Sequence, residues 1–287
     1  MATSDGKFLR GKIAHLTYRV VNGQQVVSAK STRKRNKKSV PSKKATTVFG
    51  RGSNLAWEFR AATCWLYEKF NDGQLHNRMT GNTVLALRSA LDETKTGFNL
   101  KQKTFSRLQG LDFNIKSSFK NYFFAHPLVD YAENNLVHIY LPEMNLQTEV
   151  VFPQDSRKCK ILITCSQFDL EYGHHNDTDF REFMIEKTHQ NTTSEPKFAT
   201  FKTEPGCLCI IGISLQYYQK GYLLETVMNN KKFNPATILS AYITNGIVNK
   251  FAMKKWYKMT FKTGRQLMLP PPVPVQLLLE SPNDTAA

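Results

Sequence analysis

Acidic residues are nearly missing from the first 52 positions of this 287-residue chain. Asp5 is the only Asp or Glu in that stretch, against thirteen Lys or Arg, so the stretch has a net charge of +12. The whole chain carries +16, which leaves only +4 for residues 53–287. Like charges at this density repel one another and stay hydrated, so the stretch is unable to bury itself. Such a segment is typical of proteins that bind a polyanion.

Long apolar runs and a cysteine framework are missing as well. No stretch approaches the roughly 20 apolar residues of a membrane span. The opening residues lack the apolar core of a secretory signal. The five cysteines form an odd number without framework spacing, which favours reduced, mostly buried thiols. We therefore expect a protein that is cytoplasmic, or within a particle assembled in the cytoplasm, and that has no membrane partner.

The sequence also lacks known catalytic motifs. The chain has no phosphate-binding loop, dinucleotide-binding fingerprint, zinc-protease helix, nucleophile elbow or C-x-x-C pair. Its densest polar cluster contains His174, His175, Asp177 and Asp179. Adjacent histidines point to opposite sides of a strand, and no known metal-ligand spacing is met. We interpret the cluster as an exposed connection, and we expect no metal and no cofactor.

The cysteines give no stronger sign of chemistry. Cys207 and Cys209 form a C-x-C pair that lacks a second pair or a neighbouring histidine, so we interpret both as buried core thiols. Cys64, among helical residues, is interpreted in the same way.

The first structural element is predicted to be a β-hairpin. Residues 12–21 and 24–30 flank Asn22-Gly23, and Asn-Gly is the strongest two-residue hairpin signal because a type I′ turn needs φ > 0 at both positions. This turn predicts three residue pairs: Val21 with Gln24, Arg19 with Val26, and Thr17 with Ser28. An isolated hairpin is marginally stable in water, so we expect it to dock on the body or on a neighbouring subunit.

A basic arm follows the hairpin. Residues 31–47 contain seven Lys or Arg, no acid and almost nothing apolar, so we expect extended chain that is disordered until bound. The residues predicted to contact nucleic-acid phosphates are Lys30, Arg33, Lys34, Arg35, Lys37, Lys38, Lys43, Lys44 and Arg51. Residues 33–38 also fit a nuclear import signal. A membrane-surface patch is less favoured, because no apolar face accompanies the charge.

Helical periodicity begins after the arm. Ser53 or Asn54 is a candidate N-cap, and Asn71-Asp72-Gly73 a candidate end. Between them a stripe of apolar side chains recurs at helical spacing: Leu55, Phe59, Ala62, Leu66 and Phe70. A second helix is predicted from about Leu75, with a break at residues 80–82. Both helices are expected to cover one side of a sheet.

From about residue 105 the pattern becomes β-rich. The candidate strands are residues 136–141, 146–152, 159–166, 183–187, 198–202, 207–217, 222–227, 238–244 and 256–261. Residues 119–124 and 254–258 interleave aromatic residues with Lys, which fits either a half-buried strand or a stacking platform for single-stranded nucleic acid. Short strands with polar connections favour a sandwich or a barrel-like sheet.

The predicted fold class is therefore α+β: a basic N-terminal hairpin and arm, two helices, and a β-sandwich-like antiparallel body. The expected segments are residues 1–52 for the hairpin and arm, 53–100 for the helices, 101–268 for the β-rich body and 269–287 for a proline-rich extended tail.

The N-terminal third resembles a family of Bacteroidota proteins without an assigned function. The resemblance is carried by Gly11-Lys12-Ile13, by Asn22 to Val27, by the basic stretch and by Arg51 through Phe59 to Ala62. It covers about residues 10–95 and implies a glycine-led strand, a short hairpin and a basic link into a helix. It implies no catalytic residue. The layout of basic arm and β-body also looks like that of many virion coat proteins, which is an analogy of layout alone.

We expect a non-enzymatic structural or assembly protein whose arm binds RNA or DNA phosphates without sequence specificity, within a homo-oligomer or larger assembly. The alternative is a β-sandwich module that binds a protein or a small ligand and uses the arm for docking. A metal-dependent enzyme that uses residues 174–179 is the least favoured hypothesis.

Overall fold

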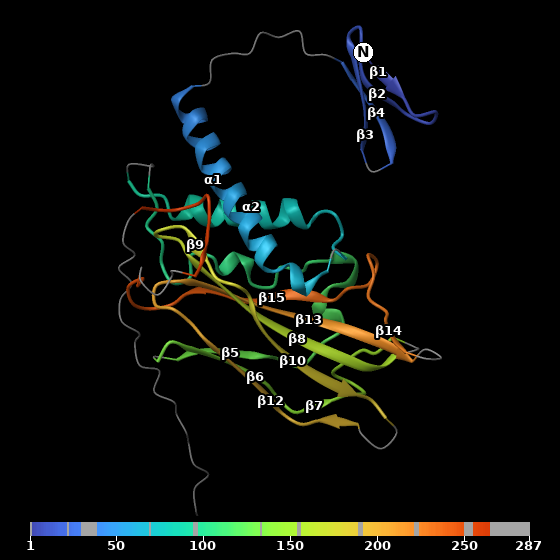
Figure 1. Cartoon of the computed structure of the whole chain (residues 1–287), viewed down its shortest axis with the longest axis vertical. Helices are drawn as coiled ribbons and strands as arrows, with labels where there is room; N and C mark the ends of the chain where they lie inside the picture. Colours follow the sequence, from blue (N-terminus) through green and yellow to red (C-terminus); the bar gives the residue numbers. More distant parts are fainter. Residues whose placement is uncertain are drawn as a thin grey trace, which may run out of the picture. The chain divides into compact units, whose positions relative to one another are not determined.

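The computed structural model describes residues 2–21, 23–29, 39–68, 70–93, 97–132, 134–153, 156–188, 192–220, 224–249 and 255–264. The chain forms two compact units, Met1–Lys43 and Lys44–Ala287 (Figure 1). The boundary between the two units lies inside the first helix, whereas the sequence predicts a boundary after residue 52. The predicted tail, residues 269–287, lies outside the described residues.

The first unit is a four-stranded antiparallel sheet in the order β1-β2-β3-β4. Its strands are β1 (Ala2–Ser4), β2 (Leu9–Ile13), β3 (Leu16–Val21) and β4 (Gln24–Ala29). Strands β3 and β4 pair as Val21↔Gln24, Arg19↔Val26 and Thr17↔Ser28, which are the pairs that a two-residue turn sets. Gly23 has φ +76°. Asn22 lies outside the described residues, so the turn type stays a prediction.

The predicted single strand at residues 12–21 is wrong. A turn at Ala14 and His15 divides it, and Ile13 pairs directly with Leu16. Ala14 has φ +48°, a left-handed conformation that few residues other than glycine adopt. The turn therefore lacks the glycine or asparagine that marks most two-residue turns, and the apolar alternation runs on across it.

Helix α1 spans Val40–Ala62, so two predictions about this region are wrong. Residues 40–47 are helical and not extended, and the candidate caps Ser53 and Asn54 lie in the middle of the helix. The cap is Ser39, whose Oγ accepts from Ser42 N (3.4 Å) and whose carbonyl accepts from Lys43 N (2.9 Å). Proline is tolerated in a first turn, where its missing N–H has no helical partner. Pro41 is therefore compatible with a helix that begins at Val40.

Helix α1 also ends sooner than the sequence predicts. It stops at Ala62, and a short 3₁₀ turn, η1 (Cys64–Leu66), continues the chain toward Asn71. Helix α2 (Leu75–Ser89) begins where the periodicity predicts, but it runs without the expected break at residues 80–82. The two helices approach closely at Gly52, where a Cβ atom would lie 2.6 Å from Val84 Cγ2.

The second unit combines helices with antiparallel sheets, and this α+β class is as predicted. The larger sheet has the order β14-β13-β8-β9-β16, with β10 also paired to β8 and β15 to β13. Its strands are β8 (Ser156–Asp169), β9 (His174–His175), β10 (Asp179–Glu186), β13 (Leu208–Lys220), β14 (Glu225–Val227), β15 (Ala236–Ile243) and β16 (Tyr257–Lys258). The smaller sheet has the order β12-β6-β5 and comprises β5 (Leu128–Ala132), β6 (Leu136–Leu141) and β12 (Lys197–Lys202).

Some candidate strands are shorter or displaced. The predicted strand at residues 146–152 is wrong: β7 (Met144–Asn145) precedes it and pairs with β11 (Thr193–Ser194). The strand predicted at residues 256–261 is reduced to β16. Between α2 and β5 the chain forms three short 3₁₀ turns, namely η2 (Ser106–Leu108), η3 (Ile115–Ser117) and η4 (Phe119–Asn121).

Two large hydrophobic clusters and a small one around Cys207 and Val248 stabilise the second unit. The first joins the helices to one face of the larger sheet through side chains such as Leu55, Phe59, Phe105, Phe168 and Ile238. The second joins the other face of that sheet to the smaller sheet through side chains that include Val137, Ile139, Ile161, Phe201 and Ile213. In Figure 1 the helices lie over β13 and β15, and strands β5, β6 and β12 lie on the opposite side of the larger sheet. Among the described residues, no helix combines the length and the apolar character needed to cross a membrane.

Candidate nucleic-acid interface

The N-terminal sheet presents two chemically different faces. Directly paired residues share a face, so Ile13 and Leu16 lie with Tyr18, Val20 and Val27 on one side. Lys12, Thr17, Arg19 and Ser28 lie on the other side, together with Val21 and Val26. No described side chain of residues 3–29 is buried, so both faces are open within this unit. The sheet is therefore amphipathic without having a core of its own.

The charge of this sheet is poorly neutralised by its own residues. Asp5 lies 3.6 Å from Arg10, and the carboxylate also accepts from Phe8 N at 2.7 Å. These interactions, led by the bond from Phe8, lower the pKa of Asp5 below its usual value. Lys12 and Arg19 form no ion pair with any described residue. The polar face thus keeps two cations that are free to contact a polyanion.

Most of the predicted phosphate contacts fall in the arm. Lys30, Arg33, Lys34, Arg35, Lys37 and Lys38 lie outside the described residues. Lys43 and Lys44 are exposed on the first turns of α1, where residues 40–47 are exposed throughout. A helix therefore carries the last two cations of the arm.

Arg51 differs from the other predicted contacts. Its guanidinium lies 4.4 Å from the ring centre of Phe98 and 5.2 Å from that of Phe261, and Nη2 donates to the carbonyl of Lys262 at 2.6 Å. Burial lowers its pKa. Arg51 therefore fastens α1 to a segment more than 200 residues away in sequence. These contacts favour a structural role for Arg51 over the predicted phosphate contact, which only a binding measurement tests.

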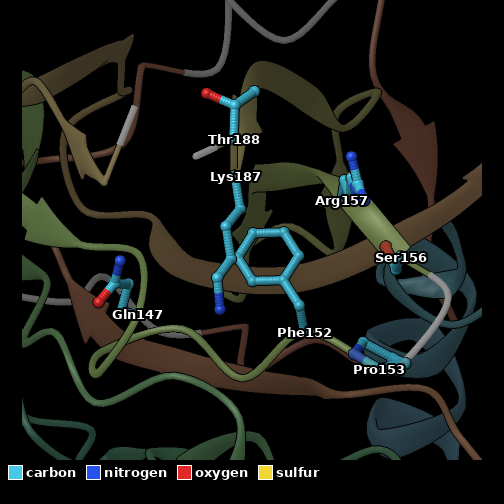
Figure 2. A pocket seen from close by; sticks show the side chains of 7 residues that line it. All are labelled: Gln147, Phe152, Pro153, Ser156, Arg157, Lys187 and Thr188. Carbon is cyan, nitrogen blue, oxygen red and sulfur yellow. The ribbon is translucent and has the colours of Figure 1, made fainter. Parts of the chain in front are cut away.

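The second unit has a basic hollow that was not predicted from the sequence. Figure 2 shows Arg157 at the start of β8 and Lys187 just beyond β10, with the Lys187 side chain beside the ring of Phe152. Lys187 N donates to the carbonyl of Arg157 at 2.8 Å, which makes the two cations neighbours. Lys187 Nζ lies 5.8 Å from the ring centre of Phe152. Thirty residues separate the two cations in sequence, so no local pattern unites them.

The histidine cluster is more enclosed than the sequence predicts. His174 and His175 are half-buried in β9, which pairs with both β8 and β16, so the predicted exposed connection is wrong for the two histidines, whereas Asp177 and Asp179 are exposed as predicted. His174 Nδ1 lies 3.2 Å from the fully buried Asp169, and the ring of His175 stacks on Tyr257 at 5.3 Å. Within the described part of the chain, no group of three or more His, Cys, Asp or Glu side chains is arranged to hold a metal ion.

Four of the five cysteines are part of the core, whereas the aromatic runs are only partly buried. Cys207 and Cys209 are fully buried, and Cys64 is exposed, contrary to expectation. Burial raises the pKa of the Cys207 thiol, and a hydrogen bond with Cys165 together with burial raises that of Cys209. In the run of residues 119–124, Phe119 and Phe123 are buried and Phe124 is exposed, and in the run of residues 254–258 Tyr257 is exposed.

Comparisons with known proteins give no relative: no family model matches the chain, and no curated protein or solved structure matches it. The resemblance of residues 10–95 to a Bacteroidota family stays a prediction.

Proposed function

We propose that this chain is a non-enzymatic structural or assembly protein whose basic N-terminal segment binds nucleic-acid phosphates with little sequence specificity. One observation carries the proposal: the N-terminal sheet buries none of its described side chains from residue 3 to 29 and leads into the basic arm. A sheet without a core gains little free energy from apolar burial, so its stability calls for a partner. Phosphate neutralises the cations, and contacts to phosphate carry no base information.

The proposal also covers the roles of the two units, the oligomeric state and the location of the protein. In it the N-terminal hairpin and the arm act together as the polyanion-binding segment. The two sheets that share the second hydrophobic cluster act as a β-sandwich-like body, and copies of the chain form a homo-oligomer or a larger assembly. The apolar face of the N-terminal sheet supports assembly, because exposed apolar side chains gathered on one face favour docking on another protein surface. The proposed location is the cytoplasm or a particle assembled there.

The salt dependence of binding tests the proposal. In a full-length variant, the six cations from Lys30 to Lys38 are replaced by Gln, which leaves the described residues unchanged. If all six contact phosphates, the log–log slope of affinity against salt should become shallower by about 4 on single strands and about 5 on duplex. Fluorescence anisotropy with a 40-nucleotide RNA or DNA over a salt series measures the slope. Equal slopes for the variant and the parent would exclude the arm as the binding segment.

A protein-binding role for the body is the second candidate. One row of the smaller sheet, Phe198–Tyr140–Leu128, faces solvent. Phe198 is 71% exposed and Leu128 62% exposed, and the rings of Phe198 and Tyr140 lie 4.9 Å apart. An exposed apolar row across three strands is typical of an interaction surface.

A further inference from the structure

The four strands of the N-terminal sheet place all of their charged residues on one face. Paired residues share a face, so the register of the strands assigns every strand position to a side. Arg10, Lys12 and Arg19 fall on the same side. The strand positions on the other side, which we call the uncharged face, hold Ala, Ser, Gly, Leu and Gln besides five larger apolar residues: Ile13, Leu16, Tyr18, Val20 and Val27.

The one amide side chain on the uncharged face already has its partners inside the sheet. Gln25 Nε2 donates to the carbonyls of Leu9 (3.0 Å) and Arg19 (3.2 Å). Its Oε1 accepts from Leu9 N at 2.8 Å. Because these bonds lie within the sheet, covering the face with another protein surface leaves the Gln25 amide satisfied and avoids the cost of an unpaired buried group.

The apolar side chains of the uncharged face are open to solvent. Val27 is 48% exposed, Ile13 46% and Leu16 39%. Tyr18 is half-buried and adds an aromatic ring, a kind of side chain that is enriched in the cores of protein interfaces. This apolar surface contributes to stability only when another surface covers it.

A second copy of the same sheet matches the uncharged face in chemistry. Two identical faces without charge meet without like-charge repulsion, and a two-fold axis gives each residue the same partner in both copies. A different protein is normally selected through complementary charges, which this face does not offer. Lys12 and Arg19 of both copies then point away from the interface, where phosphates reach them.

The size of the uncharged face indicates a weak dimer. The longest of the four strands have six residues, so the sheet covers a flat area of about 20 Å by 20 Å, or about 400 Å². A standard stable interface covers about 800 Å² per partner, so the dimer calls for a second source of affinity. Two arms bound to one nucleic-acid strand supply it, because the strand holds both copies at a high effective concentration.

We infer that the uncharged face is an interface between two copies of this chain, whose N-terminal sheets pack face to face, and that a shared nucleic-acid strand strengthens it. The role of the strand rests on the proposed function. The interface itself rests on the segregation of charge and apolar surface in the sheet, so the two parts are tested separately.

Sedimentation velocity of the full-length protein without nucleic acid, over a concentration series, tests the interface. The parent should form a dimer at the highest concentrations. Val20→Thr with Val27→Thr should raise the dimer Kd about tenfold or more, because the interface would bury four hydroxyls in place of four methyls. The matched control, Val21→Thr with Val26→Thr, makes the same change in the same two strands on the opposite face. It should alter the Kd less than about twofold, and threonine suits a strand, so both variants should fold.

Photo-cross-linking tests the interface in a protein that keeps its apolar face. Tyr18 is replaced by the photo-reactive p-benzoylphenylalanine, which retains an aromatic ring. Ordinary copies are mixed with copies labelled with nitrogen-15, so that mass spectrometry separates links between copies from links within one copy. The links between copies should fall on residues 9–29. A 40-nucleotide RNA or DNA at half the protein concentration should raise their yield severalfold, and in the six-Gln arm variant it should not.

Three outcomes overturn the inference. The first is an equal dimer Kd for the two threonine variants. The second is a set of cross-links from position 18 that fall on residues 44–264 or only within one copy, because the uncharged face would then cover the body. The third is a parent that stays monomeric with and without the strand. A six-Gln arm variant with the parent's salt slope contradicts the proposed function instead, and the interface is then decided by the measurements on protein alone.

Discussion

The guanidinium of Arg51 lies 4.4 Å from the ring centre of Phe98, on the side of α1 that faces the body. The neighbouring ring of Phe261 has its centre 5.2 Å from the same guanidinium. A cation that the sequence alone assigns to a polyanion is thus used inside the fold, since rings from two distant segments and a backbone carbonyl surround it.

Arg51→Gln should therefore weaken the fold and leave nucleic-acid binding unchanged. The loss of the cation–π contacts and of the hydrogen bond to Lys262 should lower the free energy of unfolding by about 2 kcal/mol. Urea denaturation measures this change. Arg107→Gln, at an exposed position, is the matched control and should stay within about 0.5 kcal/mol of the parent. A variant as stable as the parent but with a shallower salt slope would return Arg51 to the phosphate-binding residues.

Gly23→Val should open the β3–β4 hairpin and spare the body. Gly23 has φ +76°, where a β-branched side chain is strained by about 1–2 kcal/mol or more. Hydrogen exchange should show faster exchange of the amides of residues 16–29, and the exchange of β8 and β13 should not change. The control is Gln24→Val, which places the same side chain in a strand, where it is favoured. Equal protection in Gly23→Val and in the parent would show that this turn does not need glycine.

His174→Ala should destabilise the second unit, because Asp169 is fully buried and loses one of its partners. The Asp169 carboxylate also accepts from the backbone N–H groups of Glu171 and Tyr172. Leaving a buried carboxylate oxygen without a partner costs about 1–3 kcal/mol, which thermal and urea denaturation both detect. His126→Ala, at an exposed histidine, should have little effect.

Elemental analysis of the same proteins tests the absence of a metal site. We expect no stoichiometric zinc, manganese or iron in the parent protein. A metal that is present in the parent and lost in His174→Ala would instead establish a metal centre at β9.

Glu58→Gln should stabilise the protein at neutral pH and have no such effect in acid. Glu58 is only 4% exposed, and burial raises the pKa of its carboxyl, while Thr260 N–H at 3.4 Å and the nearby His175 oppose that rise. A carboxyl with a raised folded-state pKa stabilises the fold while it is protonated, and this stabilisation is lost as the pH rises through the folded-state pKa. The variant should therefore match the parent below the ordinary Glu pKa of 4.5 and exceed its stability progressively above it.

Unfolding in urea at a series of pH values from 4 to 8 measures this difference. A constant difference across the series would mean that Glu58 is ionised in the fold throughout that range.

Local sequence patterns predicted the elements that interactions between neighbouring residues stabilise. The Asn22-Gly23 signal placed the pairing of β3 with β4, because the length of a turn sets the register of the strands beside it. The apolar stripe of α1 and the start of α2 followed from helical periodicity. The first turns of α1 were not predicted because their basic and polar residues show no apolar stripe. Ser39 caps the helix, but a serine is recognised as a cap only when the helix after it is predicted.

The candidate sites depended on contacts that no local pattern contains. Lys43 and Lys44 are exposed as a basic segment predicts, but Arg51 is surrounded by Phe98, Phe261 and Lys262. The hollow around Arg157 forms because β8 and β10 pair antiparallel, which brings the residue after one strand beside the start of the other. Composition thus determined that the N-terminal segment is basic and unable to bury itself. Tertiary structure alone decided which cations stay exposed, because that depends on the rings, carbonyls and carboxylates that folding brings around each one.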